Sequence, residues 1–408
     1  MQRFETLLEE ATRKGSNGIP GAAVAVIDSK GDYIYKKVSG FSGVAEDAKP
    51  LDFDSIFFIA SCTKLIASIA ALQCVERGLI GLDDPLDNLL PELAQQPIIV
   101  PEDPELKSDT QPFTLRPAKN SITLRQLLTH SSGAAYDMMN PVLASWWRSQ
   151  GRTPGLAPTG DILEEYLMPR LFEAGESWTY GTGLDWAGLL IGRLNKSTLG
   201  KFVEENIFKP LEIKSTTWHL LDRLDLAERL MAMSTRSSDG TLKPVTAPIF
   251  PTDPVNESGG AGLVSSIDDY KRVLADLLKD HPITLQKETA DLLFAPQFPE
   301  GSAPLKSLYA NGKGAIDSMV GMPESLEGLK INHGLGGLIV LEDIQTNDYY
   351  KPKGTLSWMG LPNLLWSINR EKRRALFFGT QVLPWGDEKA QKLTRDFETG
   401  VWRECDGR

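Results

Sequence analysis

The sequence has few of the residues that build disulfide frameworks and metal centres. Its 408 residues include three cysteines and four histidines, and the histidines are scattered without the spacing of metal ligands. Cys62 and Cys74 fall in one apolar segment, where a cysteine usually acts as a small apolar side chain. We therefore expect no disulfide framework, no metal and no other cofactor.

Basic blocks and long apolar runs are also missing. Lys and Arg number 43 against 54 Asp and Glu, so the formal net charge is -11. This composition disfavours nucleic acid and membranes as partners. No run approaches the roughly 20 apolar residues of a membrane helix. The first ten residues form an acidic amphipathic pattern rather than a signal peptide, which predicts a cytoplasmic location.

The most prominent segment that is present spans residues 57–78. From Leu65 to Leu72 only Ser68 interrupts the apolar residues, which is typical of a buried helix, and Gly78 is a suitable C-terminal cap. The polar quartet at 61–64, Ser-Cys-Thr-Lys, opens this segment. Ser61 is thus predicted to lie in the first turn of a helix through the middle of the protein.

The spacing of Ser61 and Lys64 suggests nucleophilic chemistry. Residues three apart share a helix face, and a lysine whose ammonium form is disfavoured by burial can take the proton of a serine hydroxyl. The alternative is that Ser61 is only an N-cap, although Lys64 stands where a capping box has Glu or Gln. Ser-x-x-Lys occurs once in the chain, at the start of its most apolar helix, which favours the functional reading.

Strand patterns gather at the two ends of the chain, with helices between them. The predicted strands are 21–27, 33–38, 336–341, 355–360, 363–369 and 375–380. Helices are expected at 2–15, 122–130 with a cap at Thr123, and 387–402, whereas 97–120 is expected to be irregular. The simplest fold is α+β: one antiparallel sheet flanked by the terminal helices, with a large helical insertion. The first part of the sheet domain would be 1–60, the mainly helical domain 61–230, and the remainder of the sheet domain 231–408.

Four motifs in a characteristic order carry a family resemblance. They are the Ser-Cys-Thr-Lys at 61–64, Leu-Leu-Thr-His-Ser-Ser-Gly at 127–133, Trp-Thr-Tyr-Gly-Thr at 178–182, and Gly-Gly-Ala-Gly-Leu-Val-Ser at 259–265. Together they resemble the serine β-lactamase and penicillin-binding-protein superfamily on its class C side. Residues 58–64, 70–78 and 354–363 make the chain similar, within that superfamily, to the esterase and transesterase branch. Fungal acyltransferases of the lovastatin acyltransferase type, which pass a short acyl group from a thioester to a polyketide alcohol, belong to that branch.

The resemblance implies the roles of the candidate site residues. Ser61 would be the nucleophile, and Lys64 and Tyr180 would share general acid–base duty. The backbone N–H groups of Ser61 and Leu361 would form the oxyanion hole. The substrate-binding candidates are Trp358, Gly360, Trp385 and Trp178. Without the family pattern, Tyr180 would be a half-buried aromatic residue, and Trp385 and Trp178 would be packing residues.

Two departures from the β-lactamase pattern bear on the substrate. Thr182 replaces the asparagine of Tyr-x-Asn, and the chain contains neither Lys-Thr-Gly nor Lys-Ser-Gly. Residues 358–360, Trp-Met-Gly, occupy that place and are similar to the Trp-x-Gly of the esterase branch. A cation that would hold a β-lactam carboxylate is therefore missing, which favours neutral acyl esters or thioesters.

These observations predict a serine acyltransferase (transesterase) that moves a short acyl group from a thioester or ester to an alcohol through an acyl-Ser61 intermediate. Its partners would be a small-molecule acyl donor and an alcohol acceptor in secondary-metabolite biosynthesis, and an acyl-carrier protein is a candidate donor. The main alternative is a carboxylesterase that hydrolyses short acyl esters. A β-lactamase or peptidase, and a non-catalytic ligand-binding relative, are less favoured. The absence of a Gly-x-Ser-x-Gly elbow disfavours an α/β-hydrolase.

Overall fold

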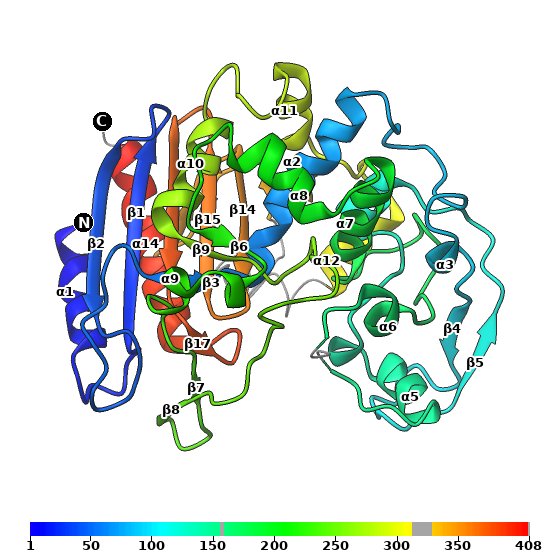
Figure 1. Ribbon diagram of the computed structural model, residues 1–408, viewed down its shortest axis with the longest axis horizontal. Coiled ribbons are helices and arrows are strands. Elements are labelled where there is room, and N and C mark those ends of the chain that lie inside the picture. Colours follow the sequence, from blue (N-terminus) through cyan, green and yellow to red (C-terminus); the bar gives the residue numbers. More distant parts are fainter. Residues whose placement is uncertain (156–158, 312–328, 407–408) are drawn as a thin grey trace.

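The largest element of the protein is a seven-stranded antiparallel sheet (Figure 1). The computed structural model describes residues 1–155, 159–311 and 329–406. The strand order is β10-β11-β14-β15-β16-β1-β2. In chain order these strands are β1 (Gly21–Asp28), β2 (Tyr33–Gly40), β10 (Ile331–His333), β11 (Leu338–Val340), β14 (Thr355–Gly360), β15 (Leu364–Asn369) and β16 (Arg374–Gly379).

The sheet joins the two ends of the chain through β1 and β16, which place Val24 opposite Phe378. Helices α1 (Gln2–Thr12) and α14 (Glu388–Asp406) cover one face, where the rings of Phe4 and Phe397 lie 5.1 Å apart. Helix α10 (Ile267–Leu277) covers the other face, where the rings of Tyr270 and Phe377 are also 5.1 Å apart. The predicted α+β fold, with an antiparallel sheet between terminal helices, is therefore confirmed.

Most of the remaining helices lie beside the sheet, in the cyan and green region on the right of Figure 1. The helices are α1 (Gln2–Thr12), α2 (Thr63–Glu76), α3 (Pro91–Ala94), α4 (Leu124–Leu128), α5 (Pro141–Ser149), α6 (Ile162–Tyr166), α7 (Gly183–Leu194), α8 (Leu199–Val203), α9 (Leu224–Ala227), α10 (Ile267–Leu277), α11 (Lys287–Leu293), α12 (Ala303–Asn311) and α14 (Glu388–Asp406). Within the described ranges, none of these helices is both long enough and apolar enough to cross a membrane.

The predicted central helix is α2, and every residue from Thr63 to Cys74 in it is buried. Gly78 ends it with a φ of +66°, and its N–H donates to the carbonyl of Val75 at 2.9 Å, as expected for a glycine cap. The start differs from the prediction because Ser61 lies in a 3₁₀ turn, Ala60–Cys62, that precedes the α-helix. Thr123 caps α4 with a full capping box, and Ser266 caps α10.

Several short strands were harder to predict. They are β3 (Ile56–Phe58), β6 (Thr216–Thr217) and β9 (Val264–Ser266) in one sheet, β7 (Ser234–Arg236), β8 (Leu242–Pro244) and β17 (Val382–Leu383) in another, and the pairs β4 (Ile98–Pro101) with β5 (Phe113–Arg116) and β12 (Ile344–Gln345) with β13 (Tyr350–Lys351).

Two expectations about the strands were wrong. Residues 97–120 are not wholly irregular, because β4 and β5 pair and bury Ile99 against the α5 side chains Leu143 and Trp147. Strand β10 was missed because it contains two polar residues. One of them, Asn332, is nevertheless buried, and its side-chain amide bonds to both the N–H and the carbonyl of Phe298.

A buried ion pair ties α14 to the sheet. Lys351 and Glu398 are 0% and 1% exposed, and their charged atoms are 3.1 Å apart. The Lys351 ammonium also donates to the Ser357 hydroxyl at 2.9 Å, and the Tyr349 hydroxyl donates to Glu398 at 2.9 Å. Burial lowers the pKa of Lys351, and the Glu398 carboxylate opposes that shift. Such a pair is costly to break because one charge is then left buried alone.

We predict that Lys351→Met lowers the free energy of unfolding by about 3–5 kcal/mol, because Glu398 loses its counter-charge. The double variant Lys351→Met/Glu398→Leu should recover most of this loss, since no buried charge remains. Urea denaturation followed by tryptophan fluorescence measures both.

The matched control is Lys392→Met, which breaks an exposed ion pair with Asp396 on the same helix. It should change the free energy of unfolding by less than about 1 kcal/mol. Equal losses in the single and double Lys351 variants would contradict the prediction.

Candidate active site

Ser61 lies in a tight turn where β3 passes into α2. Ala60, just before it, has a φ of +45°, a left-handed conformation that is unfavourable for a residue with a Cβ atom. The turn is held by two backbone hydrogen bonds, from Ile59 to the carbonyl of Leu263 and from Cys62 to the carbonyl of Ile59, both 3.0 Å. Backbone strain directly before a serine that lines a cavity is typical of a functional site.

Lys64 and Tyr180 converge on the hydroxyl of Ser61. The Tyr180 hydroxyl is 2.6 Å from Ser61 Oγ, and Lys64 Nζ donates to Ser61 Oγ at 3.2 Å. Lys64 Nζ also lies 4.9 Å from the centre of the Tyr180 ring. Helix α2 supplies Lys64, and the turn before α7 supplies Tyr180. The structure thus brings together the three residues predicted from the sequence.

A buried polar network holds Lys64 from behind. Lys64 Nζ donates to the carbonyl of Gly260 at 2.7 Å and to the Tyr136 hydroxyl at 3.3 Å. The Tyr136 hydroxyl in turn donates to Asp185 at 2.9 Å, and the Ser258 hydroxyl donates to the other oxygen of Asp185. Burial raises the pKa of Asp185, and the Lys64 charge opposes that shift. Burial, reinforced by the Asp185 charge, raises the pKa of Tyr136 well above its usual range.

Tyr136, Asp185 and Ser258 were not predicted from the sequence. Weak signals were present, because Tyr136 follows the 127–133 motif by three residues and Ser258 directly precedes the 259–265 motif. Asp185 gives no such signal. It lies inside α7, where an acidic residue is normally on the solvent side, yet its side chain is fully buried.

Aromatic side chains support Tyr180 on its far side. The His130 ring packs edge-on against Tyr180 at 4.9 Å and stacks on Trp358 at 5.7 Å. One His130 ring nitrogen accepts the N–H of Gly181 at 3.4 Å, and burial lowers the pKa of His130 well below its usual range. The buried His130 ring is not among the side chains that line the Ser61 pocket, so it supports Tyr180 from outside the pocket. Trp178 is 2% exposed, packs near His130, and is not among the side chains that line the Ser61 pocket. Its predicted substrate contact is therefore not supported.

The backbone N–H groups predicted as oxyanion donors belong to two residues that lie at the pocket. Both Ser61 and Leu361 line the pocket, and no described residue accepts a hydrogen bond from the backbone N–H of either. Gly360 precedes Leu361 at the end of β14, and a Cβ atom there would meet the carbonyl oxygen of Ile59 at 2.5 Å. Only glycine lets β14 come this close to the Ser61 turn.

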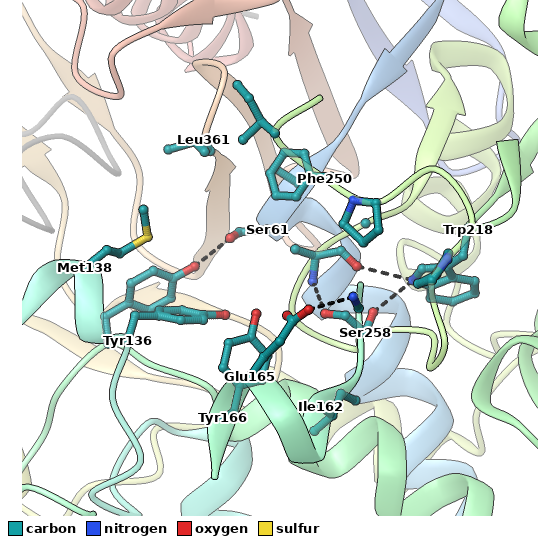
Figure 2. Close-up of a pocket in the computed structure, with 18 of the residues that line it drawn as sticks. Ser61, Tyr136, Met138, Ile162, Glu165, Tyr166, Trp218, Phe250, Ser258 and Leu361 are labelled. Carbon is teal, nitrogen blue, oxygen red and sulfur yellow. Dashed lines mark hydrogen bonds between the residues drawn. The ribbon is translucent and has the colours of Figure 1, made fainter. Parts of the chain in front are cut away.

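The pocket around Ser61 encloses about 1010 Å³ including its open mouth. Trp358 and Trp385, both predicted, lie in its wall. Figure 2 shows Phe250 and Leu361 on one side, and Glu165 and Tyr166 extending from the opposite side. Other lining side chains are mostly apolar: Met138, Met139, Ile162, Trp218, Ile249, Pro251, Pro254 and Met359. A pocket of this size and polarity suits an apolar small molecule with few polar contacts.

Comparisons with known proteins place the chain among fungal enzymes. The family model described as Beta-lactamase matches residues 4–399. The chain is similar to monacolin J acid methylbutanoyltransferase of Aspergillus terreus, with 35% identity over 403 residues that cover 97% of this chain and 95% of the relative. It is also similar to lovastatin esterase of Penicillium rubens, with 34% identity over 408 residues and 98% of each chain covered.

The fold of the chain is also similar to that of a solved structure. A mutant of simvastatin synthase from Aspergillus terreus superimposes with a TM-score of 0.88 at 33% identity, covering 100% of this chain and 98% of that one.

Glu165 gives the site a measurable pH dependence. Burial raises the pKa of this half-buried carboxyl from 4.5 to about 7. The folded protein therefore keeps a proton that the unfolded chain has lost, so Glu165 makes stability fall as the pH rises from about 4.5 to about 7.

We predict that Glu165→Gln removes this loss of stability. The melting temperature of the variant, relative to that of the wild type, should therefore be higher at pH 8 than at pH 5. Thermal denaturation at the two pH values, with Glu164→Gln as control, tests this, and an identical difference at both would contradict it.

Proposed function

The chain belongs to the Beta-lactamase family, and we propose that it is a serine acyltransferase that moves a short acyl group from a thioester to an alcohol in polyketide biosynthesis. The observation that carries the proposal is the position of Ser61 Oγ within hydrogen-bonding distance of both Lys64 Nζ and the Tyr180 hydroxyl, at an apolar pocket. Relatives of similar length are named as methylbutanoyl transferases, which supports a short branched acyl group.

In the acylation step, the proton of Ser61 Oγ passes to Lys64 as Oγ attacks the carbonyl carbon of the donor. Tyr180 supports the transfer through its hydrogen bond with Ser61 Oγ and then gives its own proton to the leaving sulfur, after which the proton on Lys64 replaces it. The bond from the acyl carbon to Oγ forms, the bond from carbon to sulfur breaks, and the thiol departs. The donor is a thioester, either free or attached to an acyl-carrier protein.

The hydrogen bonds of Lys64 suit a base. A neutral amine has two N–H groups and one lone pair. The Gly260 carbonyl and the Tyr136 hydroxyl, whose own proton points to Asp185, accept the two N–H groups. The lone pair then remains for the proton of Ser61. After that transfer the ammonium is stabilised by Asp185, through Tyr136.

The N–H groups of Ser61 and Leu361 stabilise the oxyanion of the tetrahedral intermediate. Preorganised donors of this kind are typically worth about 3–4 kcal/mol each. Trp358 and Trp385 line the walls for the acyl group or the acceptor, whereas Gly360 is not in the pocket wall and instead lets β14 approach the Ser61 turn. The tryptophan at 358 stands where β-lactamases carry a lysine, which argues against binding of a β-lactam carboxylate.

In the second step an alcohol attacks the acyl carbon, its proton passes to the Lys64–Tyr180 pair, and Ser61 Oγ leaves with a proton. Water can take the place of the alcohol, and the enzyme is then an esterase. The similarity to lovastatin esterase supports this as the second candidate function. The apolar lining favours a bulky alcohol over water.

The proposal is tested by intact-protein mass spectrometry after incubation with the N-acetylcysteamine thioester of 2-methylbutanoic acid. The wild type should gain one acyl group, and Ser61→Ala should gain none because the nucleophile is missing. Ser149→Ala, an exposed serine on α5, is the matched control and should be acylated like the wild type. A wild type that is never acylated would sink the covalent mechanism.

We predict that Tyr180→Phe slows formation of this adduct by about 10²–10⁴-fold, because it removes one of the two groups that move the serine proton. Rapid-quench mass spectrometry measures the rate. Acylation at the wild-type rate would show that Lys64 suffices alone.

The lifetime of the adduct separates the two candidate functions. In a transferase, the acyl-enzyme should persist in water for much longer than one catalytic turnover. It should lose the acyl group when a bulky alcohol such as cyclohexylmethanol is added. Rapid release in water that added alcohol does not accelerate would instead identify an esterase.

A further inference from the structure

The Ser61 pocket has one acidic side chain in its wall. Among the described residues that line it, Glu165 is the single acidic residue, and none is Lys, Arg or His. Lys64, the basic side chain beside Ser61, is buried beneath the pocket floor and donates to its own acceptors. A ligand in this pocket therefore meets negative charge and apolar surface.

The position of Glu165 is fixed by its neighbours. It lies on α6, which the side chain of Asp161 caps and which Asn256 anchors by accepting the N–H of Ile162 at 3.1 Å. Its Oε1 accepts hydrogen bonds from the Gly160 N–H at 2.6 Å and the Thr159 hydroxyl at 3.2 Å. No described residue donates to Oε2, so that oxygen is available to a ligand. Figure 2 shows the side chain extending into the pocket.

The surroundings of Glu165 leave its charge poorly compensated. Burial raises its pKa to about 7, and the charges of Asp185 and Asp161 act in the same direction. An ionised carboxyl in an apolar wall is stabilised by a hydrogen-bond donor or a cation and destabilised by a second carboxylate. Since no described residue donates to Oε2, a hydrogen-bond donor or a cation on the ligand would complete the surroundings of this carboxyl.

We propose that Glu165 is a specificity-determining residue for the acceptor, which is an alcohol that carries a second hydrogen-bond donor or a positive charge and no carboxylate. This inference rests on the proposed function, because it concerns the second substrate of the same acyl transfer. Glu165 Oε2 accepts the second donor of the acceptor and thereby orients its reacting hydroxyl toward the acyl group on Ser61.

This assignment separates the chain from one of its relatives. By its name, monacolin J acid methylbutanoyltransferase acts on a carboxylic acid. A carboxylate bound beside Glu165 would be repelled, and no described side chain in the wall carries a positive charge to hold it. The two proteins would thus share the acyl chemistry and differ in the charge of the acceptor.

The test uses three acceptors built on one ring: methyl 4-hydroxycyclohexanecarboxylate, 4-hydroxycyclohexanecarboxylic acid, and 4-(dimethylaminomethyl)cyclohexanol. Each is added at pH 8 to enzyme acylated on Ser61, and the discharge of the adduct is followed by mass. The wild type should be discharged fastest by the cationic alcohol. The neutral ester should discharge it about tenfold faster than the acid, which is the scale of one unscreened charge contact.

Two variants at Glu165 and one neighbour complete the experiment. Glu165→Gln keeps the shape of the side chain and removes its charge. The ratio of the discharge rates with ester and acid, and the ratio with cationic alcohol and ester, should both fall toward one. Glu165→Lys should reverse the order and favour the acid. Glu164→Gln makes the same chemical change one residue away, on an exposed side chain, and should keep the wild-type ratios. A wild type that uses the acid as readily as the ester, or ratios that Glu165→Gln leaves unchanged, would overturn the proposal.

Binding to the Ser61→Ala variant separates this proposal from the proposed function. Calorimetry with the three probes should give the same order of affinity whether or not the wild type forms an adduct. If no adduct forms while that order holds, acyl transfer is wrong and the charge preference of the pocket stands. If adducts form while the three probes bind and react alike, the role of Glu165 is wrong and acyl transfer stands.

Discussion

The active-site geometry depends on one close contact between the sheet and the Ser61 turn. Gly360 at the end of β14 lies so near the carbonyl of Ile59 that any side chain would push the two segments apart. Leu361, whose N–H is a proposed oxyanion donor, follows Gly360 directly in the chain. Since β14 is paired on both sides, with β11 and β15, the sheet holds one wall of the site rigidly against the start of α2. Precise placement of this kind is what an oxyanion hole requires.

The second constraint is the desolvation of Lys64. The side chain is 3% exposed, and three oxygen atoms around Nζ replace the water that it loses on folding. Asp185 lies behind Tyr136 in this network and supplies the opposing charge for the protonated state. The strained turn at Ala60 and the buried network act together, because the turn places Ser61 at the pocket and the network holds Lys64 beside it.

The reaction and the choice of substrate depend on different parts of the pocket. The proposed cluster of Ser61, Lys64 and Tyr180 does not distinguish an alcohol from water as the second substrate, and the relatives include both transferases and an esterase. Water access and the charge of the wall decide the second substrate. The identity of the acceptor is therefore better inferred from the apolar pocket lining and its single carboxyl group than from the nucleophile.

The sequence by itself determined the features that depend on local spacing. Ser61 and Lys64 are neighbours because they are three residues apart, and alternating strands such as β2 could be read directly. The order of the motifs then indicated Tyr180 and the fold. Only the tertiary structure decided which distant side chains complete the site. Asp185 and Glu165 are ordinary helix residues in the sequence, and they become functional candidates because packing buries one beneath Lys64 and turns the other into the pocket. The same packing removed Trp178 from the pocket wall, since burial is a property of all the segments that meet at a residue, not of its neighbours in the chain.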